Sequence, residues 1–322
     1  MIIAINYHYI RKDYSNPYPS IYGVTPDAFA KQLDILLKFG KFISQADIKE
    51  RIQRGDELDN HDIEFIITYD DGLREQFDEA LPILNQKGIP AVFYVNSSNF
   101  ENFNFSLVHQ IHLLRSQISS GQFLELLHKQ PKTQLNTIEK EKAFKHYQYD
   151  DAETAILKYS LNFKLTYEEQ EEIVNQEFSK YFANSEKLHK QLYMSHEQLK
   201  ELATLGYLGT HGHTHIPMGL YSKEMISDQI NISKNYLEKL TETEIYGVSY
   251  PYGSLEACQG DVPLIAEKAG LVYGFTTERA GNFSLSKPLL MSRFNCNDLP
   301  GGKSNLFAEL KVELVEKRKW FY

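Results

Sequence analysis

Two adjacent carboxylates follow an apolar run early in the chain. Asp70 and Asp71 belong to the segment Thr68-Tyr69-Asp70-Asp71-Gly72, directly after the strand-like run 65–69. Neighbouring side chains point in different directions, so one carboxylate could bind a metal ion while the other accepts a proton. Asp-Asp-Gly is also an ordinary solvated turn, because Asp and Gly both favour turns. The pair alone leaves both interpretations open.

Three histidines lie within five residues, at His211, His213 and His215. They follow another strand-like run, 207–210, and imidazole is a common ligand of zinc and similar ions. His211 and His215 can converge on one ion if this turn is helical. An extended turn would instead bring all three rings to one side of the chain. A surface cluster of histidines is the alternative without a metal.

A third segment, Ser249-Tyr250-Pro251-Tyr252-Gly253, closes the strand-like run 247–250. The proline fixes the local backbone, so the N–H of Tyr252 could point into a cleft and stabilise an oxyanion. Alone this signal is weak, since Pro-Tyr-Gly is a common turn sequence. Together the three segments are more specific, because each ends a predicted strand and the carboxyl ends of parallel strands share one rim.

Short apolar runs alternate with helix-period segments through most of the chain. This alternation predicts βα units and a mainly parallel sheet. Pro82 lies inside one predicted helix and argues against its being unbroken. The expected strands are 2–6, 65–69, 91–95, 207–210, 247–250 and 273–276, and the expected helices run from Pro26 (with Thr25 as N-cap) to Gly40, over 76–87, from Ser195 onward, over 222–240 and over 263–269.

The alternation stops between about residues 99 and 192, where the chain is polar and helix-period and has no clear strand. Apolar anchors such as Leu113, Leu114 and Phe123 argue against a disordered linker. We therefore expect a barrel domain built from 1–98 and 193–322, with 99–192 as a helical insertion or subdomain.

These segments resemble the polysaccharide deacetylases with a NodB homology domain, carbohydrate esterase family 4. The matching sequences are Thr-Tyr-Asp-Asp-Gly, Gly-Thr-His-Gly-His-Thr-His and Tyr-Pro-Tyr-Gly, and the resemblance covers the chain outside the insertion. It implies a distorted parallel (β/α) barrel, with Asp70 as general base and Asp71, His211 and His215 as ligands of a divalent metal, by default Zn²⁺. Three protein ligands leave a position open for water, as catalytic zinc requires. His213 would be a bystander.

The sequence departs from the family pattern at three points. Gly212 stands where the family has Ser or Thr, and Ser249 stands where it has the arginine that orients the catalytic aspartate. Arg293 is our candidate for that missing arginine. No histidine follows His215, so the late catalytic histidine of the family is absent. Poly-N-acetylglucosamine deacetylases carry an early Tyr-His, which implies that His8 is the general acid; the alternative is a histidine packed under a strand end.

The reaction that this resemblance implies is removal of an acyl group, by default acetyl, from an N-acylated sugar or glycan. A bound metal would polarise the amide carbonyl and lower the pKa of its water towards about 7. Asp70 would take a proton, the Tyr252 N–H would help to hold the oxyanion, and His8 would protonate the leaving amine. Two alternatives stay open: a hydrolase of a formamide, cyclic imide or ureido compound on the same fold, and a carbohydrate-binding protein with a degenerate site.

The composition indicates which binding partners and which cellular compartment to expect. The net charge of −9 argues against nucleic acid. Cys258 and Cys296 form no CxxC pair, which favours a reducing compartment. We see no signal peptide and no apolar stretch of about 18 residues, so we expect no transmembrane segment and a cytoplasmic location.

Two further segments bear on substrate and partners. A cover formed by the insertion would favour a small or lipid-linked sugar over an assembled polymer. The alternative is an insertion that packs on the side of the barrel or mediates dimerisation, so a homo-oligomer stays open. The terminal sequence Lys317-Arg318-Lys319-Trp320-Phe321-Tyr322 is expected to dock on its own domain rather than on a membrane or a partner.

Overall fold

The structure of the protein is a computed structural model. The structure describes residues 1–12, 23–59, 61–101, 104–147, 150–182, 185–302 and 315–321. It divides into two compact units. The first comprises Met1–Asp13, Gly23–Asn104 and Glu186–Tyr322, and the second contains Phe105–Ser185.

Within the described residues, eight strands form one sheet in the first unit. Neighbours along the sheet follow the order β7-β6-β5-β4-β3-β1-β8, with β2 beside β3, and every pair is parallel. The strands are β1 (Ile2–Tyr7), β2 (Lys41–Phe42), β3 (Glu64–Tyr69), β4 (Ala91–Val95), β5 (Leu208–Thr210), β6 (Gly247–Ser249), β7 (Tyr273–Phe275) and β8 (Arg293–Asn295).

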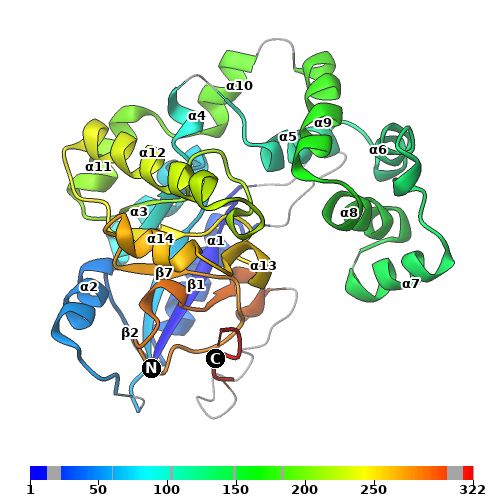
Figure 1. Cartoon of the computed structure of the whole chain (residues 1–322). Helices are drawn as coiled ribbons and strands as arrows, with labels where there is room; N and C mark the ends of the chain where they lie inside the picture. The colour runs from blue at the N-terminus through cyan, green and yellow to red at the C-terminus, as the bar shows by residue number, and fades with distance from the viewer. Residues whose placement is uncertain are drawn as a thin grey trace. The chain divides into compact units, whose positions relative to one another are not determined.

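The two ends of this strand order approach each other through the residues that precede β8. The N–H of Met291 donates to the carbonyl of Gly274 at 2.8 Å, and the N–H of Thr276 donates to the carbonyl of Met291 at 2.7 Å. The sheet is therefore a nearly closed parallel barrel surrounded by helices, which confirms the expected distorted (β/α) barrel (Figure 1).

The central strands are apolar because both of their faces are covered. All residues of β1, β3 and β4 are buried, as expected of parallel strands that pack against helices on one side and a barrel core on the other. The amino ends of the strands are closed by a polar network. The hydroxyl of Tyr94 donates to that of Tyr273, which donates to Gln45, and Gln45 donates to the carbonyls of Gly206 and Leu208.

Helices connect the strands, and most lie where the sequence predicts them. Thr25 accepts from the N–H of Ala28, and Ser195 forms a capping box with Gln198, as expected. In the first unit the helices are α1 (Pro26–Leu36), α2 (Gln45–Arg54), α3 (Leu81–Lys87), α4 (Ser98–Glu101), α11 (His196–Thr204), α12 (Lys223–Thr241), α13 (Leu255–Cys258) and α14 (Val262–Lys268). Helix α10 (Ser185–Leu192) precedes α11.

The predicted end of the first helix at Gly40 is wrong. Helix α1 ends at Leu36, and the chain turns through Phe39 before it reaches Gly40. A Cβ at Gly40 would lie 2.2 Å from the carbonyl oxygen of Ile63. Gly40 thus permits close approach of two backbones rather than capping a helix.

The predicted helix over 76–87 is divided in two. Gln76–Ala80 forms a π-helical turn, in which the N–H of Leu81 donates to the carbonyl of Gln76, and α3 follows. Pro82 has no N–H, so it cannot donate to the carbonyl of Asp78 as a continuous α-helix would require. The proline therefore lies in the first turn of the second segment.

The second unit is helical. Its helices are α5 (Leu107–Arg115), α6 (Ser120–Leu127), α7 (Thr137–His146), α8 (Ala152–Lys164) and α9 (Tyr167–Tyr181). Helix α8 packs against α6 and α7, and α5 packs against α9. The described part of 99–192 contains no strand; the domain boundaries at 98 and 193 stay a prediction.

The carboxyl-terminal segment docks on the first unit, as expected. Arg318 donates to the carbonyls of Ser284, Lys287 and Leu290. The carboxylate of Glu278 accepts from the N–H groups of Lys319 and Trp320.

Cys258 and Cys296 are buried free thiols. Among the described helices, none has the length and apolarity needed to cross a bilayer.

Candidate active site

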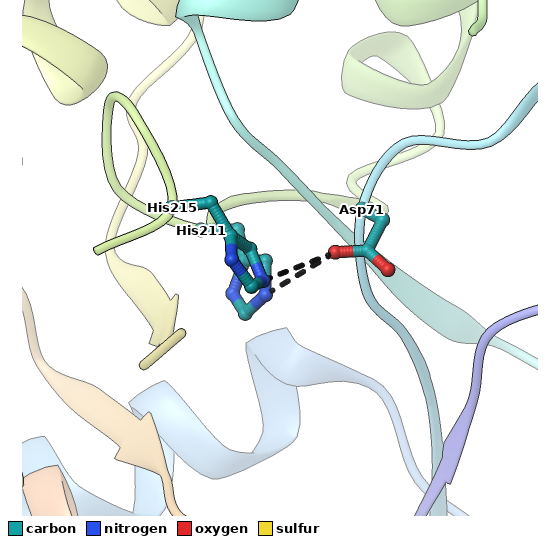
Figure 2. Close-up of side chains that lie close together, drawn as sticks. All are labelled: Asp71, His211 and His215. Atoms are coloured by element: carbon teal, nitrogen blue, oxygen red, sulfur yellow. Dashed lines mark ion pairs between the residues drawn. The ribbon is translucent and has the colours of Figure 1, made fainter. Parts of the chain in front are cut away.

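Asp71, His211 and His215 converge at the carboxyl ends of β3 and β5. Figure 2 shows the carboxylate of Asp71 pointing towards both rings. Oδ1 of Asp71 lies 3.6 Å from Nε2 of His211 and 3.5 Å from Nε2 of His215. All three side chains are buried, and one ligand atom from each lies within 4.8 Å of the others. The structure thus brings together the three residues expected to bind a metal.

The chemistry of this donor set fits a divalent cation. Nδ1 of His211 lies 2.6 Å from the carbonyl oxygen of Ser249, which can only accept. Nδ1 therefore carries a hydrogen, which leaves Nε2 as the atom of this ring that can bind a cation beside the Asp71 carboxylate. Zinc–ligand bonds of about 2.0–2.2 Å in a tetrahedron separate ligand atoms by about 3.3–3.6 Å, which matches the Asp71–histidine distances.

The backbone of this site is strained at three expected site residues. Asp71, His215 and Tyr252 have φ values of 83°, 60° and 62°. The left-handed region is unfavourable for residues with a Cβ, and such residues persist where surrounding structure holds them, often at functional sites. Among the described non-glycine residues, only Glu242 and Phe321 share this conformation. The strain therefore concentrates at the carboxyl rim of the barrel.

Two glycines allow the loops that carry Asp71 and His211 to adopt their path. Gly72 has φ of 66°, and a Cβ there would lie 2.8 Å from Cγ1 of Val95. Gly212 has φ of 74°, and a Cβ there would lie 2.6 Å from Cε of Met218. Gly212 departs from the family's Ser or Thr, and its left-handed backbone explains why glycine suits this position.

Asp70 forms a bidentate, buried ion pair with Arg293 of β8. Nη1 and Nη2 of Arg293 donate to the two carboxylate oxygens at 2.9 and 2.8 Å. The remaining guanidinium hydrogens reach Thr68 Oγ1, Ser249 Oγ and the carbonyl of Thr276 at 3.2, 2.9 and 3.2 Å. Five donors thus meet five acceptors, which is the condition for a buried guanidinium to be tolerated.

This pair keeps Asp70 ionised. Burial alone would raise the pKa of Asp70, but the charge and hydrogen bonds of Arg293 outweigh burial and hold the pKa well below its usual range. Ser249 is small enough to leave room for Arg293 and accepts from it. The arginine that the resemblance expects beside Asp70 therefore comes from β8 in this chain.

His8 directly follows β1 and also lies near Asp70. Its Nε2 is 4.0 Å from Oδ2 of Asp70, and its side chain is 29% exposed whereas that of Asp70 is 3% exposed. His8 can thus meet a molecule from solvent, while Asp70 is reached only through the site. Oδ2 of Asp70 also accepts from Nδ2 of Asn6 at 2.9 Å.

Tyr252 and His213 lie at different places relative to Asp71, His211 and His215. The ring of Tyr252 lies 5.1 Å from that of His215, and Tyr252 is half-exposed at the rim. His213 is not part of the Asp71–His211–His215 cluster, and its Nδ1 lies 2.7 Å from Oγ of Ser97. Burial lowers the pKa of His213. The catalytic and ligand roles of these residues stay predictions.

Sequence reasoning missed the residues that hold the Asp70–Arg293 pair. Asn6 is a buried polar residue in an otherwise apolar strand, which was an available signal. Thr68 and Thr276 give no such signal, because threonine is common in strands.

A parallel barrel with a carboxylate and two imidazoles converging at its carboxyl rim is typical of hydrolases with a catalytic metal site. The sequence profile described as Polysaccharide deacetylase matches residues 57–142 and 171–274, more than half of the 322 residues. The chain therefore belongs to the polysaccharide deacetylase family, which confirms the resemblance. The matched ranges include the Asp-Asp, histidine and Pro-Tyr-Gly segments but neither His8 nor Arg293.

Solved structures share the fold over nearly the whole chain. The Streptococcus pyogenes deacetylase PplD, in complex with acetate, is 16% identical, with a TM-score of 0.59 over 96% of this chain and 98% of that one. IcaB from Ammonifex degensii is 14% identical, with a TM-score of 0.55 over 95% of each chain. A de-N-acetylase from Aggregatibacter actinomycetemcomitans is 13% identical, with a TM-score of 0.53 over 91% and 94%. No curated protein sequence matches the chain.

Metal retention tests the ligand assignment. We expect one divalent ion per chain in the wild type, and expect His211→Ala or His215→Ala to lose it, because each removes one of three ligands. His213→Ala is the matched control and should retain most of the metal. Metal content after dialysis checks this; loss of metal in His213→Ala with retention in His215→Ala would contradict the assignment.

Proposed function

We propose that the protein is a divalent-metal-dependent deacetylase that removes N-acetyl groups from amino sugars of a glycan. One observation carries the proposal: in a chain of the polysaccharide deacetylase family, an Asp71–His211–His215 cluster lies directly beside an ionised, buried Asp70. Zinc is the metal that this donor set suits best, since two imidazoles and one carboxylate are typical of catalytic zinc sites.

Different residues of the chain take different roles in the proposed amide hydrolysis. The metal, when bound, supplies Lewis-acid polarisation of the amide carbonyl and a more acidic water. Asp70, oriented by Arg293, accepts the proton of the attacking water. His8 delivers a proton to the sugar nitrogen, because an amine leaves readily only when it is protonated. The backbone N–H of Tyr252 donates to the oxyanion.

The family favours a polymeric substrate. Its description names polysaccharides, so we propose a glycan in place of the small or lipid-linked sugar expected from the sequence. The charged Asp70 beside the Asp71–His211–His215 cluster favours an active enzyme over a degenerate sugar-binding site, since a general base needs an ionised carboxylate close to the reacting water.

Replacing the proposed proton-handling residues should separate turnover from metal binding. We expect Asp70→Asn to retain metal and to lose about 10²- to 10⁴-fold in turnover, the usual contribution of a general base. His8→Ala should also lose turnover and keep its metal. Acetate release and metal content would be measured on the same samples.

His61→Ala is the control for His8→Ala, because His61 is an exposed histidine just before the amino end of β3, whereas His8 follows the carboxyl end of β1. It should keep both activity and metal. Full turnover in Asp70→Asn, or loss of metal in His8→Ala, would remove the assigned role from that residue.

Substrate and metal dependence can be tested together. We expect the zinc-loaded protein to release acetate from oligomers of N-acetylglucosamine, to lose this activity after treatment with a chelator, and to regain it when zinc is restored. Formamides, cyclic imides and ureido compounds would be assayed in parallel. Turnover of one of these small compounds without acetate release from any N-acetylated glycan would contradict the proposal.

A further inference from the structure

The ladder between β1 and β3 ends just before the proposed catalytic residues. Tyr7 pairs with Tyr69, and the N–H of Asp70 donates to the carbonyl of Tyr7 at 3.1 Å. Beyond this bond lie the carbonyls of His8 and Asp70, which continue in separate loops. A buried carbonyl needs a donor, so something other than the strand ladder must serve these two groups.

The side chain of Gln76 serves both. Its Nε2 donates to the carbonyl of His8 at 2.9 Å and to that of Asp70 at 2.6 Å. One amide nitrogen carries two hydrogens, one for each carbonyl. The opposite amide orientation would place Oε1 against two carbonyl oxygens, so the contacts fix which way Gln76 points. Gln76 is fully buried, and its amide extends the ladder by one rung.

The local backbone explains how this side chain reaches the strand ends. Gln76 begins the π-helical turn, and π-turns occur frequently at functional sites. The preceding residue, Glu75, accepts from the N–H of Ile10 at 3.0 Å and from Nε of Arg11 at 2.7 Å. Two consecutive side chains thus hold the segment that carries His8.

We propose that Gln76 is a positioning residue that sets His8 relative to Asp70. The inference rests on the proposed deacetylase function. The 4.0 Å separation of His8 Nε2 from Asp70 Oδ2 depends on two loops that no strand pairing joins beyond Tyr7 and Tyr69, and the Gln76 amide joins them. Proton transfers at the two ends of one reaction need this separation to be fixed, because small misplacements of reacting groups lower rates strongly.

The chain offers a matched control. Gln45 is also buried, and its Nε2 also donates to two backbone carbonyls, those of Gly206 and Leu208. These carbonyls lie at the amino end of β5, opposite the end that carries His211. Gln45→Met and Gln76→Met therefore each remove two amide–carbonyl bonds, one pair remote from the site and one pair within it. Gln45→Met also removes the bond that Gln45 accepts from the Tyr273 hydroxyl, so it is at least as severe a change.

The test compares kcat, KM, metal content and thermal midpoint of the two variants. We expect Gln76→Met to lower kcat for an N-acetylglucosamine oligomer by about 10- to 100-fold, with KM and metal content unchanged. Gln45→Met should lower the thermal midpoint similarly and leave kcat close to that of the wild type.

A second variant, Gln76→Asn, keeps the amide but shortens it by one methylene, and should also lose kcat. Wild-type kcat in either Gln76 variant, or an equal loss in Gln45→Met, would overturn the inference. Failure of both Gln76 variants to fold would also reject it, since the bonds would then serve folding. Absence of deacetylase activity in the wild type would instead overturn the proposed function.

Discussion

The buried ion pair between Asp70 and Arg293 is the constraint on which the rest of the site depends. Two charges removed from water are tolerated only when every hydrogen of the guanidinium finds an acceptor, and removing one partner of such a pair costs about 3–5 kcal/mol. Here the acceptors come from Thr68, Ser249 and the carbonyl of Thr276 as well as from Asp70 itself. Strands β3, β6, β7 and β8 must all be in place to supply them.

Because Arg293 needs acceptors from several strands, closure of the barrel determines the geometry of the proposed catalytic site. Arg293 reaches Asp70 only because β8 lies beside β1 and the barrel nearly closes through Met291. Ser249 connects the two halves of the site, since its hydroxyl accepts from Arg293 and its carbonyl orients His211. Ser249 therefore contacts both the pair that holds the proposed proton acceptor and a proposed metal ligand. The ion pair has a second consequence, because the low pKa of Asp70 makes it a weak base that depends on accurate placement.

The sequence predicts much of this arrangement because long apolar runs and clustered polar residues are strong signals. The runs that become β1, β3 and β4 and the segments around Asp71 and His211 could be found from pattern alone. Strand β8 could not, since its sequence, Arg293-Phe294-Asn295, places a single apolar residue between two polar ones and gives no apolar run. The family resemblance implied an arginine beside Asp70 and Arg293 was our candidate, but only the fold shows that Arg293 reaches Asp70. The position of Gln76 could not be predicted either, because a π-turn has no sequence signature that separates it from an α-helix.

A double-mutant cycle on acetate release tests most directly whether Arg293 acts through Asp70. Turnover by the metal-loaded wild type, Arg293→Met, Asp70→Asn and the double variant would be measured on one N-acetylated oligosaccharide. If the arginine works by orienting and ionising the carboxylate, Arg293→Met slows the wild type but the double variant is no slower than Asp70→Asn. A double variant slower than Asp70→Asn by the full factor that Arg293→Met costs the wild type would contradict this account.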